Sequence, residues 1–567
     1  MNPGEIVQAI LKGRGILGDA AALEFLSDRP RLTYDPLLFE DMEAGASMLL
    51  AAVTAGRRVC AYGDYDVDGV CATALLCRYL RGIGGGEQIQ YYIPDRTNEG
   101  YGLNKEALAK VRSGAAFADG IPADLVVTVD CGSVSVSEAA YAQEIGLDII
   151  ITDHHDLAEG LAPGCVFLNP KRGGYPFTKL CGAGVAFKLC SAVENFRVRE
   201  TGGENRSILQ SLVDLVCIAT IADVMPLIDE NRTLVKYGLG LIRSARRPAL
   251  AAIFKVAGID PAAATVRDIA FGIAPRINAA GRLGDAAEAV ALFLTDDEVR
   301  MREGAAQLDR RNAERRHLQD ECLRECLDLA EAERVWNGVE RACFLMLEPD
   351  AAHEGISGIV AGKVREATGL PCAVLAKTKD GELKGSARSA GRLDVTALLR
   401  GRAGYFLRLG GHAAAAGFSL RKEDALRAKE DLTKDLLALL EADPEMLHEE
   451  THVDLRIESS DITPALAEAL VALAPFGQGN PIPALAFRAK ASIVSSVKAM
   501  GGNGVHVRFR AADVPCVWFS GTAPLTALLD RFPDEELEFV GCPEINVWNG
   551  RKSLQFTVSL ARPQGVV

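Results

Sequence analysis

Residues 60–69 read Cys60-Ala61-Tyr62-Gly63-Asp64-Tyr65-Asp66-Val67-Asp68-Gly69. This stretch places three carboxylates at alternate positions, where an apolar segment meets a glycine. The residues before it, Arg58–Tyr62, predict a short buried strand, and Val70–Leu80 predict an apolar helix. We therefore expect the three acids at the carboxyl end of a strand, where open α/β sheets bind ligands. An Asp-rich turn with a helix cap is the simpler interpretation of the same residues.

The chain has 567 residues, which predicts about three or four domains. Hydrophobic residues make up 49% and charged residues 24%, as in an ordinary globular protein. No predominantly apolar run reaches about 18 residues and no signal-peptide pattern is found, so a cytoplasmic protein without a membrane anchor is expected. The net charge of −14 argues against indiscriminate binding of polyanions but leaves a local basic groove open. Fourteen cysteines without a C-x-x-C pair predict reduced core thiols.

The pattern along the chain predicts an α/β protein of several domains. Residues 1–50 carry helical and turn patterns without recognisable chemistry, and residues 51–295 begin with alternating strands and helices. The further expected strands are Ile89–Ile93, Leu125–Val129, Asp148–Thr152 and Val166–Leu168. Strands that alternate with helices are typical of a parallel sheet with crossover helices.

The second half of the chain predicts three further parts. Residues 296–335 are charged and free of proline, which favours a long helix joining two lobes. Residues 336–445 predict a smaller α/β lobe. Residues 446–567 carry β signals, with an Asn549-Gly550 hairpin turn, and predict a small β-barrel. Its expected strands are Ala491–Val497, Val505–Arg510, Pro515–Phe519, Leu537–Val540 and Ser553–Leu560.

Acids and imidazoles follow further apolar segments of the first lobe. Asp130 follows one predicted strand, Asp153-His154-His155-Asp156 follows another, and Asp223 closes an apolar helical run. Because parallel strands end at one edge of a sheet, these residues are expected to share a site. Several carboxylates and two histidines suit a two-metal centre in which Asp130 would bridge the ions. The two ions would hold the attacking and the leaving oxygen of a phosphoryl displacement. Hard oxygen ligands favour Mg²⁺ or Mn²⁺, although each strand end alone is also a common turn.

Four segments resemble the motifs of the DHH phosphoesterase superfamily: Asp66-Val67-Asp68-Gly69, Val129-Asp130-Cys131-Gly132, Asp153-His154-His155 and Ile221-Ala222-Asp223. The resemblance implies two Mn²⁺ or Mg²⁺ ions and cleavage of phosphodiester or phosphoanhydride bonds. It assigns one ion to Asp66 and Asp130, and the other to Asp68, Asp130, His154 and Asp223. His155 would face the phosphoryl oxygens of the substrate. Many members carry a histidine ligand where this chain has Tyr62, so the first ion is expected to use Asp64 or to bind more weakly.

Two segments of the second lobe predict contacts to phosphate. Gly410–Gly417 is a glycine-edged loop around His412, which would bring backbone N–H groups close to a phosphate; a small-residue helix entry is the alternative. Ser386 and Arg388 lie two apart, on one face if the segment is extended, and guanidinium donates to phosphate through two N–H groups. Both segments resemble the substrate domain associated with DHH lobes.

The order of the parts is similar to the RecJ family of bacterial single-strand DNA exonucleases. The similarity includes residues 94–102, 276–282 and 475–481 and extends over nearly the whole chain after about residue 50. It implies digestion of single-stranded DNA from the 5′ end to mononucleotides, in repair and recombination. It also implies that Arg96, Ser386 and Arg388 hold the 5′ phosphate and that His412 orients the scissile phosphate. Arg276 and Asn278 would line the same groove, with a helix-cap or core-edge role left open for both.

The C-terminal barrel resembles an OB-fold, which binds single strands with a basic groove and stacking aromatic residues. Its candidate residues are Lys490, Lys498, His506, Arg508, Arg510, Trp518, Phe519, Trp548, Arg551 and Lys552, although alternating apolar residues also build a barrel core. The resemblance implies a helicase and a single-strand-binding protein as partners of a monomeric enzyme.

Three other functions remain open. The first is a hydrolase of short oligonucleotides, cyclic dinucleotides or pyrophosphate from the same superfamily, although such enzymes usually lack a terminal barrel. The second is a catalytically silent single-strand-binding relative, which the complete set of acids and histidines disfavours. The third is a structural α/β protein, which would not need acids at so many strand ends.

Overall fold

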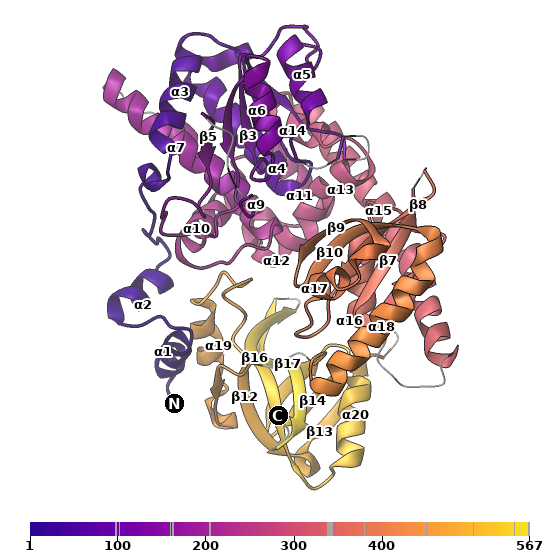
Figure 1. Cartoon of the computed structure of the whole chain (residues 1–567). Coiled ribbons are helices and arrows are strands. Elements are labelled where there is room, and N and C mark those ends of the chain that lie inside the picture. The colour runs from indigo at the N-terminus through magenta and orange to yellow at the C-terminus, as the bar shows by residue number, and fades with distance from the viewer. Residues whose placement is uncertain are drawn as a thin grey trace.

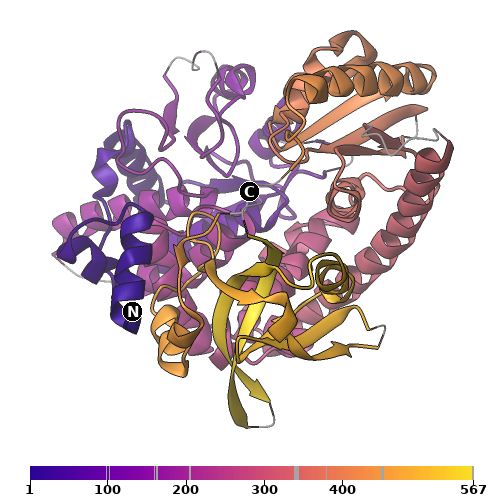
Figure 2. The same cartoon turned by 90° about the horizontal axis from the view of Figure 1, so that it is seen from below.

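The computed structural model describes the chain except for residues 97–98, 101, 159, 161–163, 203–205, 337–343, 379, 449–451, 503, 549 and 565–567. Three sheets follow one another along the chain, and each belongs to a different part of the molecule (Figure 1). Seen from below, the C-terminal sheet lies beneath two lobes that a long helix joins along one side (Figure 2). In the part of the chain that the structure describes, no helix has the length and apolar composition needed to span a bilayer.

The first sheet is fully parallel and has the strand order β2-β1-β3-β4-β5. Its strands are β1 (Val59–Gly63), β2 (Ile89–Tyr92), β3 (Leu125–Val129), β4 (Asp148–Thr152) and β5 (Val166–Leu168). The predicted strands are therefore confirmed, with β1 beginning and ending one residue later and β2 ending one residue earlier. The order reverses between β1 and β3, which places the topological switch point between the strands that precede Asp64 and Asp130.

Helices cover both faces of this sheet. α3 (Met42–Thr54), α4 (Val67–Leu80) and α7 (Gly182–Thr201) pack on one face, against side chains such as Val59 and Ala61. α5 (Lys105–Ser113) and α6 (Val136–Glu144) pack on the other face, against Cys60 and Tyr62. Because both faces are covered, the strands are mainly apolar, and the carboxylates of the candidate site follow the strand ends.

Helices complete the first lobe and connect it to the second. They are α8 (Arg206–Gln210), α9 (Val213–Ala222), α10 (Asp229–Arg243), α11 (Pro248–Ala257), η4 (Pro261–Ala263), α12 (Val266–Asp268), η5 (Ile269–Ile273), α13 (Ala274–Leu283), α14 (Ala287–Leu294) and α15 (Glu298–Trp336). α15 has 39 residues and spans both lobes. Met301 and Leu308 of α15 pack into the first core, and Cys322 and Cys326 pack into the second, which explains its narrow apolar stripe.

The second lobe contains a mixed sheet with the order β6-β7-β8-β10-β9. Its elements are β6 (Leu345–Leu347), α16 (Ser357–Thr368), β7 (Cys372–Lys377), β8 (Glu382–Arg388), α17 (Val395–Arg400), η6 (Ala403–Tyr405), β9 (Phe406–His412), β10 (Ala415–Arg421), η7 (Lys422–Asp424) and α18 (Ala425–Ala442). Residues 410–417 form the end of the β9–β10 hairpin, since Gly410 pairs with Gly417 and His412 with Ala415. The alternative of a helix entry at this segment is therefore wrong.

The C-terminal sheet has seven strands in the order β11-β12-β16-β17-β15-β14-β13. Its elements are β11 (Leu455–Arg456), η8 (Ser459–Asp461), α19 (Pro464–Val471), β12 (Leu485–Lys490), η9 (Ala491–Ile493), β13 (Ser495–Met500), β14 (His506–Ala511), β15 (Val514–Trp518), α20 (Thr522–Arg531), β16 (Glu536–Trp548) and β17 (Arg551–Pro563). The prediction of a strand at Ala491–Val497 is wrong at its start, because the Val494 amide donates to the Ala491 carbonyl and closes a turn before β13. β16 and β17 form the expected hairpin, although Asn549 of its turn lies outside the described residues.

The N-terminal segment belongs to the core of the C-terminal domain. Apolar residues of α1 (Pro3–Gly13), including Ile6 and Ile10, pack with Leu466 of α19 and Phe487 of β12. Arg14, which follows α1, donates two hydrogen bonds of 3.0 Å to Asp454 and one of 2.7 Å to Asn480. α2 (Asp19–Leu26) then leads to the first lobe, so the two ends of the chain build one domain together (Figure 1).

Candidate metal centre

The polar residues that follow the strands of the first sheet lie at one edge. In the register of the sheet, Gly63 pairs with Val129, Val129 with Thr152, and Thr152 with Leu168. The strands therefore end side by side, and the residues that follow them enter the same crevice. This register brings Asp64, Asp130 and Asp153 together although they are far apart in the sequence.

Asp68 is held by the first turn of α7. Its Oδ2 accepts a hydrogen bond from the Gly182 amide at 2.6 Å, and its Oδ1 accepts one from the Ala183 amide at 2.7 Å. Amides at a helix N-terminus have no partner within the helix and favour a carboxylate. A Cβ atom on Gly182 would lie 2.5 Å from the Cβ of Asp130, so only glycine lets α7 approach this closely. Burial and the charge of Asp66 nevertheless raise the pKa of Asp68 to about 7.

Asp66 and Asp64 occupy the turn between β1 and α4. Oδ1 of Asp66 caps α4 by accepting the amides of Asp68 at 2.8 Å and Gly69 at 3.1 Å, so the helix-cap interpretation is also correct for this residue. Asp64 is buried, and its Oδ1 has no hydrogen-bond partner in the described part of the chain. Burial, followed by the charge of Asp66, raises the pKa of Asp64 well above its usual range.

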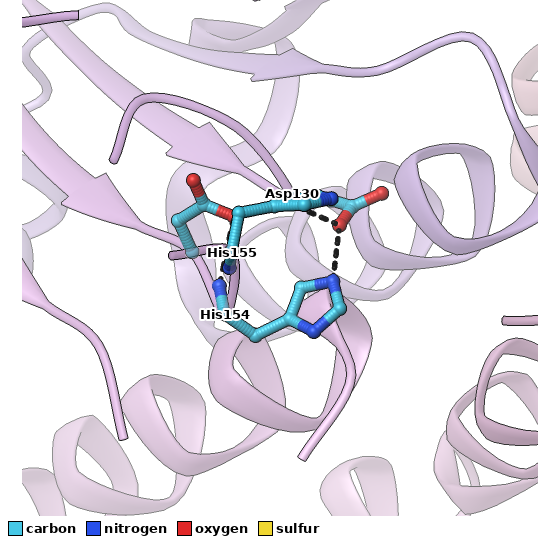
Figure 3. Close-up of side chains that lie close together, drawn as sticks. Asp130, His154 and His155 are labelled. Carbon is cyan, nitrogen blue, oxygen red and sulfur yellow. Dashed lines mark hydrogen bonds and ion pairs between the residues drawn. The ribbon is translucent and has the colours of Figure 1, made fainter. Parts of the chain in front are cut away.

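Asp130, His154 and Asp223 converge on one point. Nε2 of His154 lies 3.1 Å from Oδ1 of Asp130, 3.6 Å from Oδ2 of Asp223 and 3.7 Å from Oδ2 of Asp68. Figure 3 shows the Asp130 carboxylate directed at the His154 ring. Among the described residues, neither this Nε2 nor Oδ1 of Asp130 has a hydrogen bond of acceptable geometry, although both atoms are buried. Burial and then the charge of His155 lower the pKa of His154 to about 4, so its imidazole is neutral and can act as a ligand.

His155 is oriented by Asp153. Its Nδ1 lies 2.8 Å from Oδ1 of Asp153, which also accepts the His154 amide at 2.7 Å, while Oδ2 of Asp153 accepts the Ser133 amide at 2.8 Å. Burial alone would lower the pKa of His155, but the bond to Asp153 outweighs it and raises this pKa to about 9. The His155 side chain is 45% exposed, so its ring remains accessible to solvent.

The side chains form overlapping groups that suit divalent ions. Asp64, Asp66 and Asp130 offer one group of ligand atoms, Asp68, His154 and Asp223 offer a second, and Asp130, Asp153, His154 and His155 offer a third; within each group the atoms lie within 4.8 Å of one another. Buried carboxylates this close repel one another unless cations join them. The unpartnered atoms of Asp64, Asp130 and His154 are the ligand atoms that such cations would use. Carboxylate oxygens with one imidazole fit Mn²⁺ or Mg²⁺.

Tyr62 does not point into this group. Its hydroxyl donates to the Gly102 carbonyl at 3.1 Å, and its buried ring packs at 5.5 Å from that of Tyr92 on the opposite face of the sheet. Burial raises the pKa of Tyr62 further above its already high usual value, so the hydroxyl keeps its proton. Asp64, rather than Tyr62, lies with Asp66 and Asp130.

Comparison with known proteins identifies the family. Residues 58–220 match the DHH family N-terminal domain, residues 341–442 the DHHA1 domain, and residues 453–559 the RecJ OB domain. The single-stranded-DNA-specific exonuclease RecJ of Bacillus subtilis is 33% identical over 98% of this chain and 67% of its own length. The RecJ of Haemophilus influenzae is 31% identical over 92% of this chain and 90% of its own length. The chain belongs to the RecJ family.

Solved RecJ structures agree with this assignment. The crystal structure of RecJ in complex with Mn²⁺ from Thermus thermophilus matches 100% of this chain and 79% of its own, with a TM-score of 0.78 at 29% identity. A crystal structure of exonuclease RecJ bound to manganese matches 71% of this chain and 96% of its own, with a TM-score of 0.59 at 34% identity. The RecJ assignment confirms the resemblance and the α/β fold predicted from the sequence, including the C-terminal OB domain and Mn²⁺ or Mg²⁺ as the cofactor. The number of ions stays a prediction.

The residues that the RecJ resemblance assigns to the 5′ phosphate lie near the boundary of the two lobes. Ser386 and Arg388 are half-buried on one face of β8, as predicted, and a Cβ on Gly358 in the first turn of α16 would lie 2.8 Å from an Arg388 nitrogen. Arg96 lies on the first lobe, with its guanidinium 5.1 Å from the ring centre of Tyr65. Neither arginine has a carboxylate partner among the described residues. Their role in binding phosphate stays a prediction.

Arg282 lies between these groups, although the sequence patterns gave it no role. Its Nη1 donates to the carbonyl of Gly355, just before α16, at 2.8 Å. Burial lowers the pKa of Arg282 to about 10, and the neighbouring charges of Arg96 and Arg315 act in the same direction. A clustering of arginines from distant motifs is invisible in a linear sequence. The only signal available was that Arg282 closes a motif shared with RecJ.

The other residues to which the RecJ resemblance assigns a role also make hydrogen bonds that support the fold. Arg276 donates to Asp309 of α15 at 2.9 Å, which ties α13 to the long helix. Asn278 accepts the Val67 amide at 3.1 Å and supports the first turn of α4. His412 is exposed at the end of the β9–β10 hairpin, where its Nδ1 accepts the Ala414 amide at 3.3 Å. In the OB domain, Trp518 is a core residue, whereas Phe519 is exposed beside His506.

Proposed function

We propose that this chain is a metal-dependent exonuclease that hydrolyses phosphodiester bonds of single-stranded DNA. The observation that carries the proposal is the convergence of ligand atoms from Asp64, Asp130 and His154 at the edge of the first sheet, buried and without a hydrogen bond among the described residues. RecJ relatives with the same domains carry the name single-stranded-DNA-specific exonuclease, which supports this substrate.

Each residue of the centre has a distinct task in this proposal. Asp64, Asp66 and Asp130 hold one ion, and Asp68, Asp130, His154 and Asp223 hold the other. When bound, two such ions hold and polarise the attacking and leaving oxygens of a phosphoryl displacement and activate the attacking water. α7 fixes Asp68 through two amides, so the carboxylate is already oriented before an ion binds. His155, oriented by Asp153, donates a hydrogen bond to a non-bridging oxygen of the scissile phosphate.

We further propose that the strand is cut from its 5′ end, with release of mononucleotides. Arg96, Ser386 and Arg388 hold the terminal phosphate, and His412 orients the scissile phosphate. Arg96 and Arg388 are half-buried and have no carboxylate partner in the part of the chain that the structure describes, which supports this role, because guanidinium groups bind phosphate through two N–H groups at once. Action in DNA repair and recombination in the cytoplasm, by a monomer that works with a helicase and a single-strand-binding protein, is the expected context.

Digestion of end-labelled DNA with Mn²⁺ tests the proposal. Substrates are single strands with a 5′ phosphate, single strands with a 3′ phosphate, a blunt duplex, a dinucleotide and pyrophosphate, with Asp130→Asn as the inactive control. Stepwise loss of nucleotides from the 5′ end of single strands only, absent from the control, is the expected result. Cleavage limited to dinucleotides or pyrophosphate would assign the chain to another branch of the superfamily. Strand binding without cleavage in any divalent metal would make it a binding protein.

A further inference from the structure

A groove of about 840 Å³ opens beside Asp223, between the first lobe and the C-terminal domain. One wall consists of α10, η5 and the residues directly after Asp223, and the other consists of residues 471–482. Figure 1 shows α19 and the chain that follows it beneath α10 and α12. Val224, the next residue after the proposed metal ligand Asp223, lines the groove.

The segment 475–481, which resembles RecJ, fixes the far wall of this groove. The Leu227 amide donates to the Gln478 carbonyl at 2.7 Å, and the Arg232 guanidinium donates to the Ala474 carbonyl at 2.7 Å. Nδ2 of Asn480 donates to the carbonyls of Leu473 and Pro475 at 2.9 and 2.8 Å. The first two bonds hold the C-terminal domain against the segment that follows Asp223, and the Asn480 bonds fix the conformation of residues 473–480. The shape of the groove is therefore set by specific hydrogen bonds.

The groove exposes large apolar side chains to solvent. Val224 is 65% exposed, Ile482 60%, Val471 67% and Phe271 76%. Phe271 lies in the π-helical turn η5, and a Cβ on Gly272 would collide with the Ile259 side chain, which fixes the backbone beside Phe271. Single exposed apolar residues are ordinary, whereas several in one concave surface indicate a binding site.

Cations accompany these apolar side chains. The Arg267 guanidinium lies 5.7 Å from the ring centre of Phe271. Lys236 donates to the Ser27 carbonyl at 2.6 Å and Arg243 to the Ala264 carbonyl at 3.0 Å. Within the described ranges of the chain, none of these three cations has a carboxylate partner, and Asp28 is the single acid that lines the groove there. An apolar floor with unpaired cations complements a strand that offers bases on one side and phosphates on the other.

We infer that this groove binds the bases of the substrate strand on the 3′ side of the scissile phosphate, with Phe271 as a stacking platform and Arg267 as a phosphate contact. The inference rests on the proposed function and deepens it. In that function the 5′ phosphate is held at the boundary with the second lobe, so the rest of the strand leaves the metal centre on another side. Val224, next to Asp223 in the chain, lines the groove, so a strand that leaves on the Asp223 side would reach it. Stacking on a protein aromatic ring does not depend on the base, so the site serves any sequence.

The first experiment measures binding without catalysis. Strands of about 12 nucleotides, a length within the range of single-strand binding sites, carry 2-aminopurine at successive positions and are mixed with the wild-type protein in Ca²⁺. Stacking quenches 2-aminopurine fluorescence, so one or two positions near the 5′ end are expected to be quenched. Phe271→Ala restores the fluorescence at those positions and weakens binding about tenfold, while Phe271→Trp keeps the quenching. Leu426→Ala, which removes an exposed apolar side chain of α18, is the matched control.

The second experiment uses digestion in Mn²⁺ and separates this inference from the proposed function. For strands of about 12 nucleotides, Phe271→Ala raises KM about tenfold with little change in kcat, whereas dinucleotides that do not reach the groove are cut as by the wild type. An abasic site at the quenched position raises KM for the wild type but has no further effect on Phe271→Ala. Arg267→Ala lowers the salt dependence of binding by about one counterion. If the wild type cuts strands of about 12 nucleotides and Phe271→Ala cuts them with the same KM, the inference is wrong but the proposed function stands. If the wild type cuts no single strand, the proposed function is wrong.

Discussion

At the scale of single residues, Asp130 combines two properties that one substitution can test separately. It is buried beside other carboxylates, which raises its pKa well above the usual range, and its backbone is left-handed, with φ 63°. Asparagine accepts a left-handed backbone nearly as well as aspartate, so Asp130→Asn removes the charge without straining the turn. This substitution therefore separates the role of the Asp130 charge from the role of its backbone conformation.

We expect Asp130→Asn to be more stable than the wild type in EDTA, by about 1 kcal/mol or more, because one buried carboxylate is removed. The same variant loses the rise in melting temperature that Mn²⁺ gives the wild type, and hydrolysis falls at least about a thousandfold. Urea unfolding in EDTA, thermal unfolding with and without Mn²⁺, and a digestion assay measure these effects. Equal destabilisation in EDTA and in Mn²⁺ would show that Asp130 is a structural residue.

Tyr62 tests the departure from the histidine that many DHH proteins carry. Since its hydroxyl bonds the buried Gly102 carbonyl, Tyr62→Phe leaves that carbonyl without its donor and costs about 1 kcal/mol of unfolding free energy. Activity and Mn²⁺ affinity stay at the wild-type level, because the side chain is on the other face of the sheet. Urea unfolding and a Mn²⁺ titration of activity distinguish the two roles. A weaker Mn²⁺ affinity in the variant would show that Tyr62 contributes to metal binding.

At the scale of elements, the N-terminus of α7 positions the metal centre. Gly182→Ala places a methyl group against Asp130, so α7 has to move away and the two amide bonds to Asp68 lengthen. We expect the variant to keep its helix content but to lose most of its activity and most of the Mn²⁺-induced stabilisation. Circular dichroism, thermal unfolding with Mn²⁺ and digestion measure these three quantities.

Gly240→Ala is the matched control for this substitution. Gly240 lies inside α10, and a Cβ there meets nothing within 4 Å. The control is expected to gain about 0.5–1 kcal/mol of stability from the helix propensity of alanine, with unchanged activity. If Gly182→Ala behaved like Gly240→Ala, the close approach of α7 would have no role in the metal centre.

At the scale of the whole molecule, α1 connects the beginning of the chain to its end. Ile10 is fully buried in the core of the C-terminal domain, so Ile10→Ala is expected to cost about 2–5 kcal/mol there. Hydrogen exchange should show lost protection in β12 and β14, with no change in β1 and β3. Leu23→Ala, at a 70% exposed position of α2, is the control and should leave both regions unchanged. Lost protection in β1 instead would show that the N-terminal segment stabilises the first lobe.

The sequence by itself determined the strands of the first sheet and the residues at their ends. Strand periodicity and turn chemistry are local, so Leu125–Val129 and Asp148–Thr152 were predicted residue for residue. A run of small residues at Cys181–Gly184 was a weaker signal and was missed, because nothing local shows that its amides meet a carboxylate 114 residues away. The strand Ala491–Val497 was misplaced because a turn bond, not side-chain pattern, decides where β13 begins.

Only the tertiary structure decided which of these residues meet. The strand order β2-β1-β3-β4-β5 places Asp64 beside Asp130, and the packing of α5 and α6 buries Tyr62 on the sheet face that they cover. The packing of α1 on the C-terminal sheet and the groove around Phe271 likewise join segments that are hundreds of residues apart. Local chemistry follows from neighbours in the chain, whereas these contacts depend on how whole faces pack, and a linear pattern does not encode that choice.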